Sequence, residues 1–538
     1  MSVVSTICPN IDVNLQHKDV MVTSPQAVSI RQWISTSYSN SQASFAMPPP
    51  SNTVFIDRCF IKATPAVITV TGTTSGSAML QGGYDALRGY PIAAITISDQ
   101  LTINNQTFVI QTSELIPYMA RYWKQSKFSS FPSMLDNYQV YADGVAAINN
   151  PLGQYFNAID HHQPRGGYPM VIVNGATSST ITCTVYEPVW IPVLHRKYGM
   201  GVGLTNVRTC DLVSNYSSNL PRIFSHALSS ATISSVSVAL GQPIIYQMYS
   251  TPPVGTVPRP MTYGAEDLNR FITTYGSALT SNSSVTLTST NIQLNAIPKW
   301  ILVFVREANA NLTYASTDTA CRIDNVSINF NNISGILSSA SSHDLFKASV
   351  QNGLQDTWEQ WWGITSNLAT KVGTTGSFMK LYFGKDITLQ AGEYPGKIGA
   401  YNLSMNVTFT NVNQSASITN PTLYIITSVP QKVIIHEGGQ VETILGVSGE
   451  EGEYVPYNEV MKHYGGSFGD FMNKIGRALG KAVGFLKDSH IISNVASMIP
   501  HPIAQTIGTS ARAIGLGDGD GGRVMSRREL MSRVKSYK

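Results

Sequence analysis

The sequence predicts an all-β protein built from two β-sandwiches in tandem, followed by a basic, partly helical C-terminal extension. The body, residues 1–461, is rich in Ser, Thr, Asn, Val, Ile and Tyr and contains many short runs of alternating polarity. Charged residues make up 13% of the chain, against about 25% in a typical domain. Residues 462–538 hold twelve Lys and Arg against five Asp and Glu, a net charge of +7, which leaves −3 for the body.

The low charge indicates that much of the exterior is covered by copies of the same chain, because a dispersed monomer needs a charged surface. A secreted β-protein with a Ser, Thr and Asn-rich surface is the alternative. The N-terminal arm, residues 1–27, shows no basic region followed by an apolar core, so we expect no signal peptide. Five scattered cysteines without CxxC spacing favour reduced thiols.

The first sandwich is expected over residues 28–255. Ile181, Cys183 and Val185 alternate with Thr182 and Thr184, as in a strand with one buried face. Further strands are expected at Val54–Ile61, Ala66–Val70, Leu101–Ile110 and Ile233–Leu240.

The second sandwich is expected over residues 256–445, after a linker, Thr251–Pro260, whose four prolines cannot join a strand ladder. The clearest strand of the chain is Tyr401–Thr410, an unbroken alternation of apolar and polar residues. Val326, Ile328 and Phe330 repeat the pattern. Other strands are expected at Val285–Leu294, Trp300–Val305, Phe378–Phe383 and Leu423–Thr427.

One helix is predicted inside the second sandwich, at Asp344–Trp362, from apolar residues at helical spacing. Its end carries Trp358, Trp361 and Trp362. We interpret this cluster as a loop anchor or subunit contact rather than a platform for a sugar.

No motif for catalysis is present. The sequence lacks GxxxxGK[ST], GxSxG, HExxH and paired CxxC motifs. His161-His162 is the best metal or acid/base candidate, but adjacent residues could ligate one ion only from a loop, and the following QPRGG indicates a solvated loop. We therefore expect no catalytic residue, no metal and no cofactor.

The extension, residues 446–538, contains a predicted amphipathic helix. Its apolar stripe runs at steps of three and four residues through Phe468, Phe471, Met472, Ile475, Leu479 and Leu486. Gly476, Gly480 and Gly484 border this stripe and permit close approach to another surface. The helix could pack on its own domain or face a partner or a membrane.

A separate basic end follows the flexible spacer Gly515–Gly522. It holds one acid, Glu529, and the basic residues Arg523, Arg527, Arg528, Arg533, Lys535 and Lys538. This charge favours phosphate or anionic lipid without any base-specific signal, and a simply solvated end is the alternative.

Several segments, in their order along the chain, resemble the double jelly-roll major capsid proteins of icosahedral DNA viruses, the hexon-like group. The first half contains DALRGYPI (Asp85–Ile92), QLTINNQTF (Gln100–Phe108), YEPVWIPVL (Tyr186–Leu194), GVGLTNV (Gly201–Val207) and SNLPRIFS (Ser218–Ser225). The second half contains PKWILVFVRE (Pro298–Glu307), IDNVSINFNNISGILSSASSHDLF (Ile323–Phe346) and GSFMKLYFGKDITL (Gly376–Leu389). The resemblance covers residues 28–445, and a long basic tail is not general in that family.

The resemblance implies a structural protein of the virion that forms homotrimers with a pseudo-hexagonal outline. These would contact neighbouring capsomers and minor capsid proteins, with assembly in the host nucleus or cytoplasm. The tail would face the interior, towards the genome, an internal membrane or the neighbouring capsomer. The alternatives are a carbohydrate-binding or carbohydrate-cleaving β-sandwich protein, such as a viral fibre or lectin, and a nucleic-acid-packaging protein.

Overall fold

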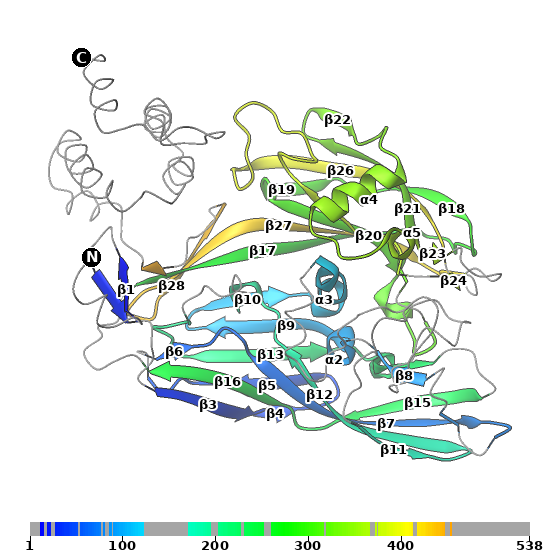
Figure 1. The fold of residues 1–538 in the computed structure, drawn as a ribbon, viewed down its shortest axis with the longest axis horizontal. Coiled ribbons are helices and arrows are strands. Elements are labelled where there is room, and N and C mark those ends of the chain that lie inside the picture. The colour runs from blue at the N-terminus through cyan, green and yellow to red at the C-terminus, as the bar shows by residue number, and fades with distance from the viewer. Residues whose placement is uncertain are drawn as a thin grey trace, which may run out of the picture. The chain divides into compact units, whose positions relative to one another are not determined.

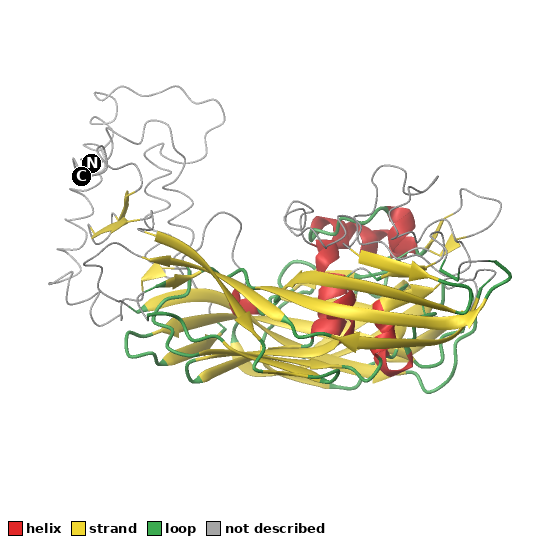
Figure 2. Ribbon diagram, turned by 90° about the horizontal axis from the view of Figure 1, so that it is seen from below, coloured by secondary structure: helices red, strands yellow, loops and turns green. Residues whose placement is uncertain are grey.

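A computed structural model of the 538-residue chain divides into two compact units, residues 1–454 and 455–538. The structure describes residues 11–14, 19–22, 27–51, 54–76, 79–80, 85–88, 90–122, 170–194, 203–226, 231–251, 260–316, 319–365, 372–373, 375–412, 417–446 and 452–453. All of them belong to the first unit, which is strand-rich (Figures 1 and 2).

The first sandwich consists of two antiparallel sheets. The five-stranded sheet has the order β10-β9-β13-β5-β4, and the seven-stranded sheet has the order β11-β12-β7-β16-β3, with β15 on β7 and β6 on β16. The strands of the five-stranded sheet are β4 (Ser37–Tyr38), β5 (Gln42–Ala46), β9 (Thr96–Ile103), β10 (Gln106–Ile110) and β13 (Cys210–Tyr216). Those of the seven-stranded sheet are β3 (Ala27–Ile34), β6 (Phe55–Ile56), β7 (Ile61–Thr73), β11 (Met170–Asn174), β12 (Ser178–Pro188), β15 (Thr232–Leu240) and β16 (Ile244–Thr251).

The second sandwich also has two sheets. The six-stranded sheet has the order β25-β20-β27-β17-β29 with β28 on β27, and the five-stranded sheet has the order β18-β26-β21-β22 with β19 on β26. The first comprises β17 (Met261–Thr274), β20 (Trp300–Glu307), β25 (Met379–Tyr382), β27 (Pro421–Ile435), β28 (Val441–Leu445) and β29 (Gly452–Glu453). The second comprises β18 (Ser284–Thr288), β19 (Ile292–Ala296), β21 (Arg322–Phe330), β22 (Ile333–Ile336) and β26 (Ile398–Thr410).

Short elements complete the described fold. The helices of the first half are α2 (Pro91–Ile95), α3 (Thr112–Met119), and the 3-10 turns η1 (Ala120–Tyr122), η3 (Pro192–Leu194) and η4 (Leu220–Ile223). The second half adds η5 (Asn309–Asn311), α4 (Ser342–Gln351) and α5 (Trp358–Trp362). Three strand pairs stand apart from the sandwiches: β1 (Ile11–Asn14) with β2 (Asp19–Val22), β8 (Asp85–Leu87) with β14 (Phe224–His226), and β23 (Ile364–Thr365) with β24 (Val372–Gly373).

The alternating segments form strands as predicted. In β26, Tyr401, Leu403, Met405, Val407 and Phe409 are buried in the sandwich while the residues between them face outward. β20 behaves differently, because all residues from Trp300 to Arg306 are buried. A strand covered on both faces reads as a continuous apolar run, as the segment PKWILVFVRE does.

Three predicted strands have other bounds in the structure. Leu101–Ile110 is a hairpin, since the chain turns at Asn104, whose φ is 52°, between β9 and β10. Val285–Leu294 forms two strands, β18 and β19, that both pair with β26. Within Val54–Ile61 only β6 is a strand before β7 begins at Ile61.

The prediction of one helix over Asp344–Trp362 was wrong, because the segment forms two helices. A capping box of Ser341 and Asp344 starts α4, and the chain leaves the helix at Asn352 and Gly353, where φ is 102°. A second capping box, at Thr357, starts α5. Apolar spacing alone did not reveal these local start and stop signals.

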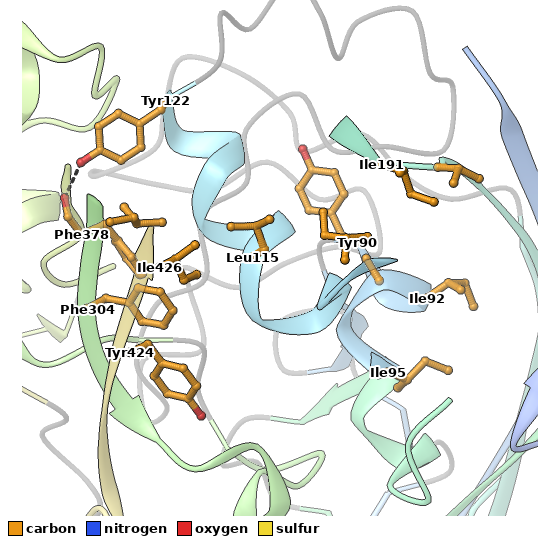
Figure 3. Packing of buried hydrophobic residues seen from close by; sticks show 14 of the residues in the cluster. Tyr90, Ile92, Ile95, Leu115, Tyr122, Ile191, Phe304, Phe378, Tyr424 and Ile426 are labelled. Carbon is orange, nitrogen blue, oxygen red and sulfur yellow. Dashed lines mark hydrogen bonds between the residues drawn. The ribbon is translucent and has the colours of Figure 1, made fainter. Parts of the chain in front are cut away.

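The buried apolar core runs through both sandwiches without a break. Figure 3 shows part of it, where Leu115 and Tyr122 of the first half lie near Phe304, Tyr424 and Ile426. Among the described residues, no helix is long and apolar enough to cross a membrane.

Candidate functional site: sandwich junction and uncharged sheet faces

The predicted tail contacts lie outside the described residues. This holds for the basic residues from Arg523 to Lys538 and for the apolar stripe from Phe468 to Leu486, and also for His161-His162. Their roles stay predictions. Within the described residues no group of three or more His, Cys, Asp or Glu side chains could hold a metal ion.

The first contact between the sandwiches comes from η1. The Tyr122 hydroxyl donates to the carbonyl oxygen of Phe378, 2.7 Å away (Figure 3). Beside it, Arg121 forms a 2.8 Å ion pair with Asp356, and both side chains are buried. Burial raises the pKa of Asp356, while the charge of Arg121 opposes the rise. A buried carboxylate of this kind requires its cation, so the pair holds η1 to the second sandwich.

Lys380 lies at the same contact. Its Nζ is 4.4 Å from the ring centroid of Trp300 and 5.3 Å from that of Tyr122. Burial lowers the pKa of Lys380 to about 8, partly opposed by Glu266. The aromatic faces offset some of the cost of burying this cation through cation–π attraction.

A second contact is made by two arginines of the first half. Arg88 donates from Nε to the carbonyl oxygen of Arg222 (2.8 Å) and from a terminal nitrogen to that of Ser316 (2.6 Å). Arg222 donates to the carbonyl oxygens of Thr313 (3.0 Å) and Ser316 (2.8 Å). Both arginines are buried, so the 313–316 loop of the second half is held by charge-assisted hydrogen bonds.

A third contact involves Tyr263 of β17. Its hydroxyl donates to the carbonyl oxygen of Gly203 (3.1 Å) and accepts the amide hydrogen of Thr205 (3.0 Å). Nearby, the Asn206 side chain donates to the carbonyl oxygen of Ile435 (3.2 Å). Together the three contacts join the two sandwiches at several separate places and through buried groups.

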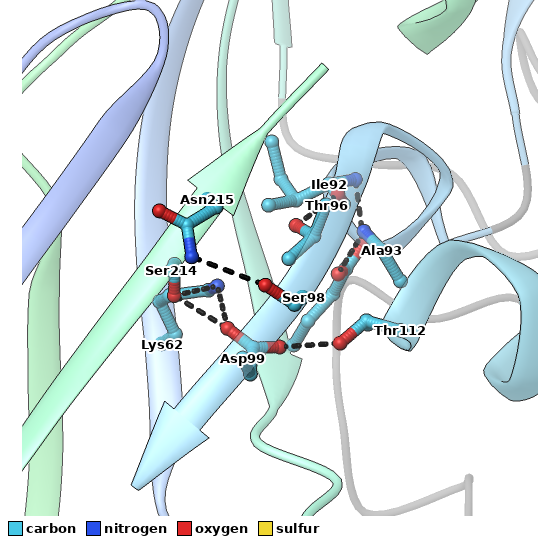
Figure 4. Close-up of polar contacts among 10 residues, drawn as sticks. Lys62, Ile92, Ala93, Thr96, Ser98, Asp99, Thr112, Ser214 and Asn215 are labelled. Atoms are coloured by element: carbon cyan, nitrogen blue, oxygen red, sulfur yellow. Dashed lines mark hydrogen bonds and ion pairs between the residues drawn. The ribbon is translucent and has the colours of Figure 1, made fainter. Parts of the chain in front are cut away.

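A buried polar cluster lies inside the first sandwich (Figure 4). Lys62 Nζ is 3.4 Å from Asp99 Oδ1 and donates to Ser214 Oγ at 2.9 Å. Asp99 also accepts from Thr112 at 2.8 Å and from Ser214. Burial alone would lower the pKa of Lys62, but the charges of Asp99, Tyr216 and Glu187 outweigh it and raise that pKa.

Glu187 is the second carboxylate of this cluster. It accepts the backbone amide hydrogens of Ile92 (3.0 Å) and Ala93 (2.8 Å) at the start of α2. Burial raises the pKa of Glu187 to about 7, although both amides and Lys62 favour the charged form. The cluster ties β12 to α2 and has the character of a structural network.

The strands of the seven-stranded sheet place no charged side chain on its outward side among the described residues, and the nearest acid, Asp57, follows β6 opposite Met248 at the margin. We call this surface the uncharged face. Arg31, Lys62 and Glu187 of the same strands occupy the register positions of the core side. The uncharged face comprises Ile30, Gln32, Ile34, Ile61, Pro65, Val67, Thr69, Thr71, Val171, Val173, Thr180, Thr182, Thr184, Tyr186, Ser235, Ser237, Ala239, Ile244, Tyr246 and Met248.

The two other outward sheet sides differ in chemistry. That of the five-stranded sheet in the first sandwich carries Asp211 on its central strand. That of the β18-β26-β21-β22 sheet is mainly Asn, Ser and Thr, with the Arg322–Asp324 ion pair (2.6 Å) at one end. Of these three outward sheet sides, as far as the structure describes them, the uncharged face is the one that combines the absence of charge with many exposed aliphatic side chains.

The tryptophan cluster has its ring faces occupied within the chain. Trp358 stacks on Trp362 (4.9 Å between centroids) and on Trp361 (5.8 Å). The guanidinium of Arg322 lies 4.2 Å from the ring centroid of Trp362, and Trp361 is fully buried. Stacking of this kind anchors α5 and leaves little open ring surface for a sugar.

Sequence reasoning missed the residues of the junction and of the buried cluster. Arg88 and Glu187 stand in two quoted segments, DALRGYPI and YEPVWIPVL, where a charge interrupts an apolar run. A charged residue inside an apolar segment that becomes buried needs a polar partner, so each interruption could have indicated a buried hydrogen-bonded or ion-paired group. The partners themselves, such as the 313–316 loop, are more than two hundred residues away from Arg88.

Comparisons with known proteins agree over both halves. The family model for the first domain of the Sputnik virophage major capsid protein matches residues 9–253, and the model for the C-terminal domain of major capsid protein V20 matches residues 268–430. Putative capsid protein V20 of Sputnik virophage is 34% identical over 588 aligned residues, covering 99% of each chain.

Solved structures give the same result. The cryo-EM structure of the Sputnik virophage matches with a TM-score of 0.72 and 30% identity, over 86% of this chain and 96% of that one. The mavirus major capsid protein matches in fold, with a TM-score of 0.64 and 15% identity over 78% and 90% of the two chains. These matches leave the carbohydrate-binding alternative without support. The chain belongs to the major capsid protein family of the Sputnik virophage, as a double jelly-roll structural protein of the virion and not an enzyme.

Proposed function

We propose that this capsid protein assembles as a homotrimer whose six jelly rolls form a pseudo-hexagonal capsomer of an icosahedral shell. The buried junction carries the proposal. Arg88, Arg121 and Tyr122 hold the two sandwiches as one unit, so three copies present six jelly rolls in a fixed arrangement. The low content of charge supports extensive contact between copies.

Within this proposal the chain divides into an arm (1–27), two jelly rolls (28–255 and 256–445) and the extension (446–538). The basic end of the extension faces the interior, where it contacts the genome, an internal membrane or the neighbouring capsomer. Minor capsid proteins bind between capsomers. Assembly takes place in the host nucleus or cytoplasm.

The test is the oligomeric state of the purified full-length protein. Mass photometry is expected to show a species of three times 58.4 kDa, and negative-stain microscopy is expected to show particles with a near-hexagonal outline. A clean monomer at high protein concentration contradicts the proposal.

A further inference from the structure

We propose that the uncharged face is the surface through which one copy of this chain contacts the next. This inference rests on the proposed capsomer but concerns a different question, namely which surface each copy uses. The partner is a second copy of the chain.

Strand register makes the uncharged face continuous. Val171 of β11 lies opposite Thr182 of β12, which lies opposite Val67 of β7, and Ala239 of β15 completes the row. A parallel row joins Val173, Thr180, Thr69 and Ser237. Adjacent strands lie about 4.8 Å apart, so each row is a continuous strip across four strands.

Large apolar side chains on this surface are left in water. Val171 and Val173 are each 68% exposed, and Ile30 and Ile34 on the opposite edge of the sheet are 70% and 57% exposed. Exposed aliphatic groups over a whole sheet face mark an interaction surface, because monomers rarely keep large apolar patches uncovered. Val171 also belongs to an edge strand, where pairing with another chain is a hazard unless the edge is covered.

The absence of charge identifies the class of partner. A nucleic-acid backbone or an anionic lipid surface is bound through Lys and Arg, and the uncharged face offers neither. A matching partner is itself uncharged and apolar. The chain supplies such surfaces, since only 13% of its residues are charged and its neighbours in a capsid are copies of itself.

The size of the surface also fits. The uncharged face contains about twenty side chains, and stable protein interfaces use about 20–30 residues on each side. A threefold arrangement joins two different surfaces of neighbouring subunits, so the uncharged face meets a different part of the next copy.

A charge scan with matched threonines tests the inference. Thr182→Lys places a cation on the uncharged face, whereas Thr107→Lys and Thr286→Lys place one at equally exposed threonines on the other two outward sheet sides. Thr182→Lys is expected to raise the dissociation constant of the oligomer about a hundredfold or more, because an unpaired charge would be buried between copies. The oligomer is measured by mass photometry over a dilution series, and circular dichroism checks the fold of each variant.

A second measurement covers the case in which Thr182→Lys fails to fold. Thr182→Cys is made in a background in which Cys8 and Cys59 are replaced by Ser, and its rate of reaction with maleimide is compared in the assembled and the diluted protein. Assembly is expected to slow this reaction at least tenfold. Thr286→Cys is the matched control.

The outcomes separate this inference from the proposed trimer. An oligomer of any size that is lost in Thr182→Lys supports the contact surface, even if that oligomer is not a trimer. If the oligomer is also lost in either Thr107→Lys or Thr286→Lys, that threonine marks the opposing surface of the contact, and the inference stands. A trimer that keeps its affinity in folded Thr182→Lys, or equal labelling of Thr182→Cys in both states, overturns the inference and leaves the trimer intact.

Discussion

At the scale of single residues, Glu187 is a fully buried carboxylate with a raised pKa. It is buried with a second acid, Asp99, and one cation, Lys62, so the ionised cluster carries an unbalanced negative charge. Burial is the main cause that raises the pKa of Glu187 to about 7, from an ordinary value of 4.5, and the negative charge of Asp99 adds to the rise. The two amide hydrogens of α2 reduce this rise without cancelling it.

The first prediction concerns pH. Because the pKa of Glu187 is higher in the folded than in the unfolded chain, the folded protein binds the extra proton between pH 4.5 and 7. The stabilisation that this proton gives the folded protein is fully present below pH 4.5 and is lost as pH rises through 7. We expect Glu187→Gln to reduce the difference in unfolding free energy between pH 5 and pH 8 by roughly 2 kcal/mol.

Urea unfolding of both proteins at the two pH values measures this effect. Glu437→Gln is the control, because Glu437 is an exposed carboxylate at the surface. An unchanged pH dependence in Glu187→Gln would show that the carboxylate does not titrate in this range.

At the scale of elements, the contact of η1 with the second sandwich shows how distant segments become one unit. Arg121 follows α3 in the first half, and Asp356 precedes α5 in the second. Each is buried and charged, so neither can be placed at low energy without the other. The ion pair thus selects one arrangement of the two sandwiches.

The second prediction tests this pair. Arg121→Met leaves the Asp356 carboxylate buried without its cation, and we expect the unfolding free energy to fall by about 3–5 kcal/mol. The double variant Arg121→Met, Asp356→Leu is expected to regain at least half of the loss, because no lone charge remains. Denaturant unfolding of the three proteins gives the values.

Lys299→Met is the matched control for the ion-pair experiment. Lys299 lies 3.9 Å from Glu266, with side chains 47% and 34% exposed, and such a pair contributes at most about 1 kcal/mol. Equal losses in Lys299→Met and Arg121→Met would refute a special role for the buried pair.

At the scale of the whole molecule, charge is divided between a nearly neutral body and a basic extension. The strands of the seven-stranded sheet keep charged side chains off its outward side, while the last sixteen residues hold six Lys and Arg against one acid. The proposed association between copies and the predicted attraction to anions thus belong to different parts of one chain.

The third prediction concerns the extension. Deleting Gly515–Lys538 removes up to six phosphate contacts, so we expect weaker retention of DNA and a fall of about 5 in the slope of log affinity against log salt. The oligomeric state of the body should remain that of the full chain. Unchanged retention with an unchanged salt slope would exclude the basic end as a genome contact.

Much of the architecture could be predicted because it depends on periodicity and composition. Alternation along Tyr401–Thr410 predicts β26, and the apolar run Trp300–Val305 predicts β20. The break between α4 and α5 was missed, since apolar spacing continued across Asn352 and Gly353. The junction was missed because Arg88 and Ser316 come together only through the packing of two sandwiches.

By itself the sequence determined an all-β double sandwich, the absence of catalytic motifs, the resemblance to capsid proteins and the separation of charge, since these depend on residue types and their local spacing. Only the tertiary structure decided which side of each sheet lies open, which charges are buried and which loops join the two halves. The physical reason is that alternation of polarity shows that a strand has an apolar and a polar side, but it does not show which part of the molecule covers either side. The uncharged face became visible only when register aligned Val171 and Thr182 of one hairpin with Val67, more than a hundred residues earlier, on one open side.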